Sequence, residues 1–148
     1  GAAVECLRAG CAGLWLQNRT RSHLEALVAQ LGPVARGIPV RAVGEGASAA
    51  DVPRGSVVIN ATSAGLRATD AAPADLGVFQ DVAAVYDMIY NPAETPLLRQ
   101  ARARGLPHAN GLGMLVHQGA KSLEIWTGVP AGETAPAMRR AAAKALGY

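Results

Sequence analysis

Two arginines lie in a short polar segment between an expected strand and an expected helix. Arg19 and Arg21, interleaved with Asn18 and Thr20, follow a short apolar run of strand length. At the end of the second strand of a dinucleotide-binding domain, an acid binds the ribose hydroxyls of NAD, whereas an arginine pairs with the 2′-phosphate of NADP. No acid precedes Glu25 here, and a guanidinium presents a planar fork of donors that matches phosphate. The segment therefore favours NADP if it is a dinucleotide site, and is otherwise a polar loop with exposed arginines.

Other polar or small residues follow the later strands. Asn60 closes a β-branched run, and the small residues at 61–65 would let a backbone approach a flat ligand. Asp87 lies in the next apolar run, where a carboxylate must be paired or near the sheet end; we expect structural hydrogen bonds rather than catalysis. Gly111 and Gly113 open a helix whose N-terminus favours negative charge. Each segment alone is equally an ordinary turn.

No segment supplies a recognisable catalytic or metal centre. A Ser-His-Asp order, a nucleophile elbow, a Walker loop and metal-ligand spacing are all missing from the sequence. His117 has no visible orienting partner, so we expect it to face solvent. Cys6 and Cys11 are interpreted as free, partly buried thiols, typical of a reducing cytoplasm.

Composition excludes several classes of protein. Half of the 148 residues are hydrophobic and 17% are charged, which is unlike a disordered chain. The net charge of +3 is spread along the chain, and only 4% of residues are aromatic, so no nucleic-acid partner is expected. Arg99, Arg102 and Arg104 are interpreted as a solvated helix face. No apolar run approaches the ~18 residues of a membrane helix, and no signal peptide opens the sequence, so no membrane partner is expected either.

Strands alternate with helices, which predicts an α/β fold with a mostly parallel sheet. Helices are predicted at residues 2–8, 21–31, 96–104, 114–126 and 134–146. Strands are predicted at residues 13–17, 40–43, 56–60 and 83–88. Residues 44–54 are predicted as a loop with one helical turn, and residues 66–82 as mostly loop. Ser22 with Glu25 is the expected capping box of the second helix, which Gly32-Pro33 should end, and Thr95 is the expected N-cap of the third. The apolar strand at 56–60 should be buried on both faces.

These elements indicate one Rossmann-like, doubly wound domain with C-terminal helices. The glycine-rich turn and first strand that should precede residue 1 are not in the sequence, so we expect a sheet that lacks its first strand. Ligands should bind at the carboxyl ends of the strands.

Taken together, the motifs strongly resemble those of shikimate dehydrogenase, over nearly all of the chain and only in that family's C-terminal, NADP-binding half. The segments that carry the resemblance are Asn18-Arg19-Thr20, Val58 to Leu66, Tyr86 to Pro92, Glu94 to Leu98, Gly111 to Ala120 and Trp126-Thr127-Gly128. The resemblance implies an oxidoreductase that reduces 3-dehydroshikimate to shikimate with NADPH, in chorismate and aromatic amino acid biosynthesis.

The resemblance also implies roles for individual residues. The 2′-phosphate site would be lined by Asn18, Arg19, Thr20, Arg21, Ser22 and His23. The cofactor groove would be edged by Ala61, Thr62 and Ser63, and the nicotinamide would be approached by Met88 and Gly111. The substrate would be reached by Tyr90 and Gln118. The catalytic Lys–Asp pair of the family belongs to its N-terminal substrate domain, so no catalytic residue is assigned in this chain.

We therefore expect residues 1–148 to be a single NADP-binding domain, a fragment of a longer two-domain cytoplasmic enzyme, inactive alone and compatible with a homodimer. Two alternatives stay open: a quinate/shikimate dehydrogenase that uses NAD, and a stand-alone nucleotide-binding module without catalysis.

Overall fold

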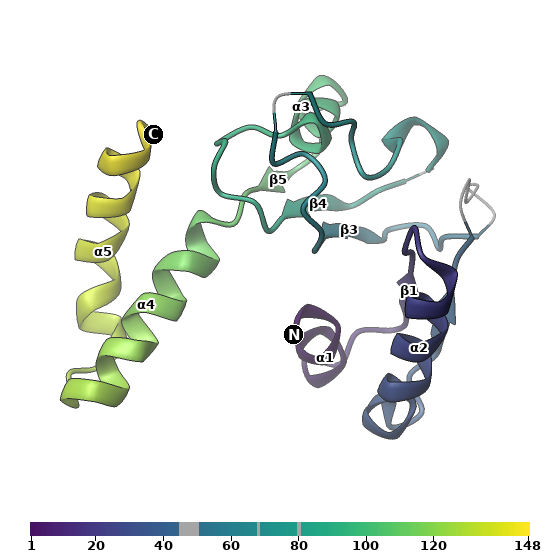
Figure 1. Cartoon of the computed structure of the whole chain (residues 1–148), viewed down its shortest axis with the longest axis horizontal. Coiled ribbons are helices and arrows are strands. Elements are labelled where there is room, and N and C mark those ends of the chain that lie inside the picture. Colours follow the sequence, from purple (N-terminus) through teal and green to yellow (C-terminus); the bar gives the residue numbers. More distant parts are fainter. Residues whose placement is uncertain (45–50, 68, 80) are drawn as a thin grey trace. The chain divides into compact units, whose positions relative to one another are not determined.

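The computed structural model describes residues 1–44, 51–67, 69–79 and 81–148, so most of the helical turn predicted within 44–54 lies outside the described residues. The chain divides into two compact units, Gly1–Pro53 and Arg54–Tyr148 (Figure 1). Each unit holds one parallel sheet.

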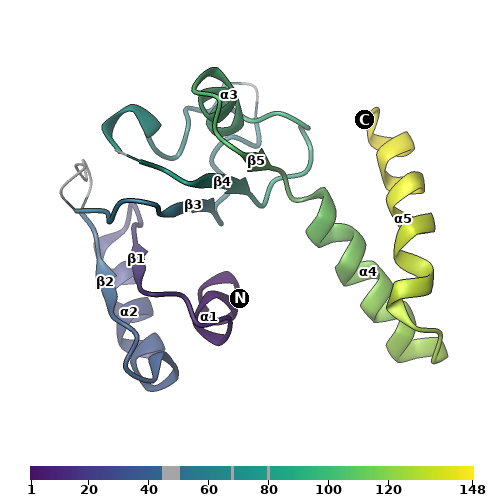
Figure 2. The same ribbon diagram turned by 180° about the vertical axis from the view of Figure 1, so that it is seen from behind.

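The first unit is a two-stranded sheet with two helices. Its elements are α1 (Ala2–Arg8), β1 (Leu14–Leu16), α2 (Arg21–Ala35) and β2 (Val40–Ala42). β1 and β2 run parallel, with Leu14 opposite Val40 (Figure 2). Leu7 of α1 packs with Leu31 and Ala35 of α2 in the core of this unit. Both strands and the first helix were predicted from the sequence.

The predicted start of α2 at Arg21 is confirmed, but the expected cap and the expected C-terminal end were wrong. The N-cap is Thr20 rather than Ser22, because the Asn18 side chain accepts the Thr20 N–H at 2.8 Å and fixes the chain one residue before the helix. The capping box does not form, because Glu25 pairs with Arg21 instead. At the other end, the helix runs through Pro33 to Ala35. Leu31 and Ala35 lie four residues apart on one buried face, and this burial compensates for the N–H that proline lacks.

The second unit is a three-stranded parallel sheet with helices. It contains β3 (Val57–Asn60), the 3-10 helix η1 (Leu76–Val78), β4 (Ala84–Asp87), α3 (Pro96–Ala103), β5 (His108–Ala109), α4 (Leu112–Thr127) and α5 (Ala131–Leu146). The strand order is β3-β4-β5, and Asn60 lies opposite Asp87. Buried Val85, Leu97, Leu98 and Leu76 form much of its core.

The predicted class, mixed α/β with parallel strands, is confirmed. Two local expectations failed. The strand at 56–60 is not buried on both faces: Val57 and Ile59 lie two residues apart, so they share one face of β3, and they are 54% and 40% exposed. β5 was not predicted, because two residues are too few to show a strand period.

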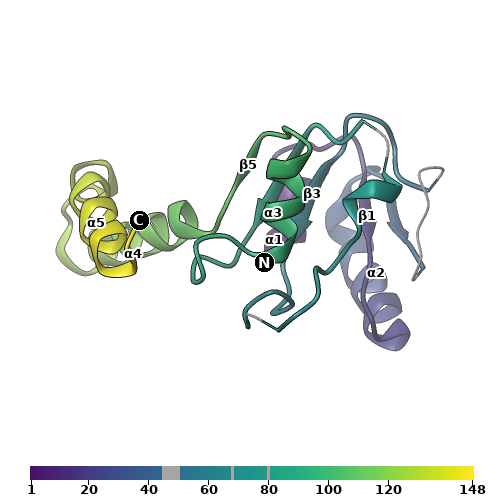
Figure 3. The same ribbon diagram turned by 90° about the horizontal axis from the view of Figure 1, so that it is seen from above.

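The last two helices contact each other and run antiparallel, side by side in Figure 1 and overlapping when seen from above in Figure 3. Gly128, with φ of 76°, ends α4 in the left-handed conformation that glycine permits. α5 begins at Ala131, three residues before the predicted start, because Glu124 accepts the Ala131 N–H at 3.3 Å and anchors the earlier turn. Pro136 therefore lies inside the helix. None of the helices in the described ranges is both long and apolar enough to cross a bilayer.

Candidate functional site

The carboxyl ends of the three strands in the second unit are tied together through their backbones. Met88 N–H donates to the carbonyl of Asn60 at 3.0 Å, which continues the β3–β4 ladder past the last strand residue. Gly111 N–H donates to the carbonyl of Ile89, also at 3.0 Å. The segments after β3, β4 and β5 therefore meet at one edge of the sheet, as expected for the ligand-binding edge of a parallel sheet.

Gly111 lies directly against the backbone of Met88. A Cβ placed on Gly111 would overlap the carbonyl oxygen of Met88 and would lie 3.2 Å from its Cα. The φ of Gly111 is −73°, so packing rather than backbone conformation requires glycine here. The two residues that the resemblance assigns to the nicotinamide end are thus neighbours.

The loop after β3 is curled by the side chain of its last residue. Asn60 Oδ1 accepts the N–H and the hydroxyl of Thr62 at 3.0 and 2.7 Å. Asn60 Nδ2 donates to the carbonyl of Ala64 at 3.0 Å. Ala61, Thr62 and Ser63 are all exposed, so the loop presents its small residues to solvent at the carboxyl edge of the sheet.

Asp87 is fully buried at the end of β4. Its side chain accepts hydrogen bonds from Asn60 Nδ2 at 3.0 Å, the Ile89 N–H at 3.0 Å and the Thr95 hydroxyl at 2.6 Å. The expectation that this carboxylate is paired is confirmed. Thr95 in turn caps α3, where its Oγ1 accepts the Leu98 N–H at 3.3 Å, as the sequence predicted.

The predicted phosphate loop forms the start of α2 in the first unit. No side chain caps this 15-residue helix, and Arg21, Ser22 and His23 of its first turn are exposed. Its N–H groups therefore face solvent with the positive end of the helix dipole.

The two arginines of that loop are not equivalent. Arg21 Nε donates to Glu25 at 2.8 Å, and this hydrogen bond raises the pKa of the Arg21 guanidinium. Arg19 makes no ion pair within the described part of the chain and is exposed. Arg19 is consequently the cation of this loop that is available to an anion.

The two predicted substrate residues are not joined by a hydrogen bond in the described structure. Tyr90 is 36% exposed, and its carbonyl accepts the hydroxyl of Tyr148. Gln118 is exposed on α4, where its carbonyl accepts the Ser122 hydroxyl at 3.0 Å. Their role in substrate binding stays a prediction.

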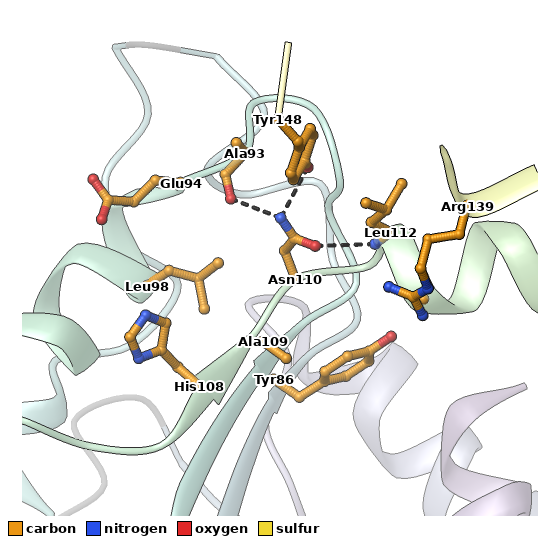
Figure 4. A pocket seen from close by; sticks show the side chains of 11 residues that line it. Tyr86, Ala93, Glu94, Leu98, His108, Ala109, Asn110, Leu112, Arg139 and Tyr148 are labelled. Carbon is orange, nitrogen blue, oxygen red and sulfur yellow. Dashed lines mark hydrogen bonds between the residues drawn. The ribbon is translucent and has the colours of Figure 1, made fainter. Parts of the chain in front are cut away.

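A cavity of about 520 Å³ adjoins the sheet edge beside β5. At its centre Asn110 donates to the Ala93 carbonyl at 2.9 Å and to the Tyr148 hydroxyl at 2.8 Å (Figure 4). Burial raises the pKa of the Tyr148 hydroxyl, and the bond from Asn110 opposes that rise. Arg139 also lines this cavity, but none of the residues predicted to bind cofactor or substrate does. Sequence reasoning missed Asn110 and Tyr148, because they lie 38 residues apart and carry no shared motif.

Comparison with known proteins shows which family this chain is similar to. Residues 111–143 match the family described as the shikimate 5'-dehydrogenase C-terminal domain. The NADP(+) shikimate dehydrogenase of Azorhizobium caulinodans is 42% identical over 123 residues, which cover 83% of this chain and 42% of that relative. Over most of its length the chain is therefore similar to part of the shikimate dehydrogenases.

Solved structures of a shikimate dehydrogenase and of a quinate dehydrogenase have the same fold over most of this chain. The shikimate dehydrogenase of Thermus thermophilus, solved with NADP(H) and shikimate, matches 95% of this chain and 50% of its own length, with a TM-score of 0.73 and 32% identity. The quinate dehydrogenase of Corynebacterium glutamicum, solved with NAD, matches 93% of this chain and 48% of its own, with a TM-score of 0.79 and 26% identity. The chain thus spans about half the length of the solved shikimate dehydrogenases and less than half that of the curated relatives that it matches.

Proposed function

We propose that this chain is the NADP-binding part of a shikimate dehydrogenase, an oxidoreductase that reduces 3-dehydroshikimate to shikimate. In this proposal residues 1–148 form one cofactor domain of a two-domain enzyme. The close contact of Gly111 with Met88 carries the proposal, because it joins the two strand-end segments assigned to the nicotinamide and leaves no side chain between them. The names and bound ligands of the relatives support the same assignment.

The residues present fit a dinucleotide phosphate. Arg19 offers an unpaired guanidinium beside the uncapped start of α2, which is the chemistry that a 2′-phosphate requires. The first turn of α2 holds no acid, so nothing there favours the ribose hydroxyls of NAD over that phosphate. Asn18, Thr20, Ser22 and His23 would complete this part of the site.

The chain's own contribution to catalysis is binding and orientation. NADPH, when bound, supplies the hydride. Arg19 would hold the phosphate, and Arg21, which is paired with Glu25, would line the same loop. The residues that would shape the groove for the nicotinamide end are Ala61, Thr62, Ser63, Met88 and Gly111. Tyr90 and Gln118 would orient the substrate through its polar groups. Proton transfer is assigned to the substrate domain, since no residue of this chain matches the catalytic pair of the family.

Cofactor titration tests the proposal. We expect the chain to bind NADPH more tightly than NADH. Arg19→Ala should lose at least ~1.5 kcal/mol of NADPH binding, the scale of a charged hydrogen bond, and should leave NADH binding unchanged. Arg99→Ala removes the same charge from the exposed side of α3 and serves as the control. A preference for NADH, or an Arg19→Ala variant that binds NADPH like the unmodified chain, contradicts the proposal.

One alternative is a quinate dehydrogenase that uses NAD, which the likeness to the C. glutamicum enzyme favours. The same titration separates it from the proposal. The other alternative, a binding module without catalysis, is separated by joining the chain to a shikimate dehydrogenase substrate domain and assaying shikimate oxidation. We expect turnover by the joined protein and none by the chain alone.

The free thiols of Cys6 and Cys11 support a reducing, cytoplasmic location for this enzyme. A homodimer stays a prediction, and sedimentation velocity of the joined protein would test it.

A further inference from the structure

Buried polar side chains in the second unit form a hydrogen-bonded chain from β3 through β4 to α3. Among the described residues, Asn60, Asp87 and Thr95 are the buried polar ones, at 3%, 0% and 0% exposed. Asn60 Nδ2 reaches Asp87 Oδ1 at 3.0 Å, and Thr95 Oγ1 reaches Asp87 Oδ2 at 2.6 Å. Asp87 Oδ1 also accepts the Ile89 N–H. Asp87 is therefore the junction between two strand ends and the start of a helix.

The side chain of Asp87 is held without a counter-charge. It takes part in none of the ion pairs of the described residues, and neutral groups donate all three of its hydrogen bonds. Burying a carboxylate is costly unless its oxygens are bonded. No buried side-chain nitrogen or oxygen in the described part of the chain lacks a partner. Because charged acceptors form stronger hydrogen bonds than neutral ones, Asp87 fixes its donors more tightly than an amide would.

The donors of Asp87 control the segments assigned to the cofactor. Asn60, held by Asp87, curls the next loop through Thr62. The Ile89 N–H, held by Asp87, fixes the segment that carries Met88, and the Ile89 carbonyl accepts the Gly111 N–H at 3.0 Å. Each of these segments is thus connected to the Asp87 carboxylate through at most two successive hydrogen bonds.

We propose that Asp87 is a positioning residue for the cofactor: its buried carboxylate sets the relative placement of the loop after β3 and the segments after β4 and β5. This inference rests on the proposed function, because it concerns the same nucleotide site. Asp87 itself is fully buried, so its side chain would not contact a bound cofactor. Its effect is transmitted through Asn60, Ile89 and the Thr95 cap of α3.

The test compares Asp87→Asn with Val85→Ala in the unmodified 148-residue sequence. Val85 lies two residues earlier in β4 and is 2% exposed, so its truncation destabilises the same strand without touching the network. NADPH titration is done well below the unfolding midpoint of both variants. We expect Asp87→Asn to bind NADPH about tenfold more weakly, the effect of one charged hydrogen bond. Val85→Ala should bind NADPH within about twofold of the unmodified chain, although its unfolding free energy falls at least as much as that of Asp87→Asn.

A second pair keeps the proposal testable if Asp87→Asn does not fold. Thr95→Val removes the hydroxyl that donates to Asp87, whereas Thr95→Ser keeps it. We expect Thr95→Val to weaken NADPH binding and Thr95→Ser to restore it. Asp87→Asn and Thr95→Val variants that bind as tightly as the unmodified chain would overturn the proposal.

Hydrogen exchange separates failure of this inference from failure of the proposed function. If the unmodified chain does not bind NADPH, the proposed function is contradicted. Exchange at the Thr62 and Ile89 amides then still shows whether Asp87 orders the two loops. Asp87→Asn should speed exchange at these amides beyond any change in global stability, and Val85→Ala should not. Equal exchange in both variants would overturn the positioning role.

Discussion

Gly111 packs so closely on Met88 that a Cβ would occupy the place of the Met88 carbonyl oxygen. The contact joins the segments that follow β4 and β5, and its closeness is set by two backbones rather than by a flexible side chain. Any residue other than glycine at position 111 must therefore separate these segments.

Gly111→Ala should cost about 1–3 kcal/mol of unfolding free energy, typical of overpacking, and should weaken NADPH binding. Chemical denaturation and cofactor titration measure the two effects. Gly113→Ala is the matched control, because its Cβ would meet only the end of the Arg139 side chain, at 3.4 Å. This control should be neutral or slightly stabilising, since alanine favours helix. Equal stability of the two variants would contradict the packing argument.

The cap of α3 should be a measurable source of stability. Thr95→Val keeps the shape of the side chain but loses the bonds to Asp87 and to the Leu98 N–H, so we expect about 2 kcal/mol lower unfolding free energy. Thr95→Ser keeps both bonds and should lose less. Urea denaturation compares the variants, and equal losses would show that packing of the methyl group, not the hydroxyl, matters here.

The joint between α4 and α5 should weaken in acid. The hydrogen bond from Lys121 is the main cause that lowers the pKa of Glu124 below its ordinary value of 4.5, and the Ala131 N–H contributes. Because the folded pKa is the lower one, this stabilisation is present above 4.5 and is lost as the pH falls through the folded value. Glu124→Gln should therefore lower the melting temperature at pH 7 and have little effect at pH 3.

The control for this prediction is Lys121→Gln, which removes the principal cause of the shift but keeps the carboxylate. It should reduce the pH dependence without abolishing it. A Glu124→Gln effect of the same size at both pH values would contradict the assignment.

Cys6 should be a slow thiol. Burial raises the pKa of Cys6 above 9.0, and the nearby Cys11 and Glu5 raise it further. Less thiolate is present at a given pH, so alkylation at pH 8 should be slower than for an unstructured thiol. The Cys11→Ser variant isolates the reaction of Cys6, and the same variant in urea is the control. Equal rates in the folded and the unfolded state would contradict this prediction.

The sequence correctly predicted those helix and strand ends that are determined by neighbouring residues in the chain. The Thr95-Pro96 start of α3 was predicted because a cap and the residue after it decide it by themselves. The Ser22 cap was wrong because the helix already begins at Arg21, after Thr20, whose N–H donates to the Asn18 side chain. β5 exists only through its pairing with β4, in which Ala109 lies opposite Tyr86, and no pattern within two residues can express that.

In the candidate site, too, some features could be predicted from the sequence and others could not. Strand ends could be found from the sequence, since polar residues follow apolar runs at Asn60 and Asp87. The distance between Gly111 and Met88 could not, because it depends on how two segments 23 residues apart are brought together by the sheet. The unequal availability of Arg19 and Arg21 also needed the structure, because both precede Glu25 and only one of them pairs with it.

The final helix has no buried residue. It contacts α4, and the hydroxyl of Tyr148, two residues beyond the helix, donates to the Tyr90 carbonyl and accepts from Asn110 Nδ2. Segments with few buried contacts open at a lower free energy than the core of a protein, so we expect α5 to detach before the rest of its unit unfolds. Each such opening would release the Tyr90 carbonyl and leave the chain around Tyr90 free to rearrange.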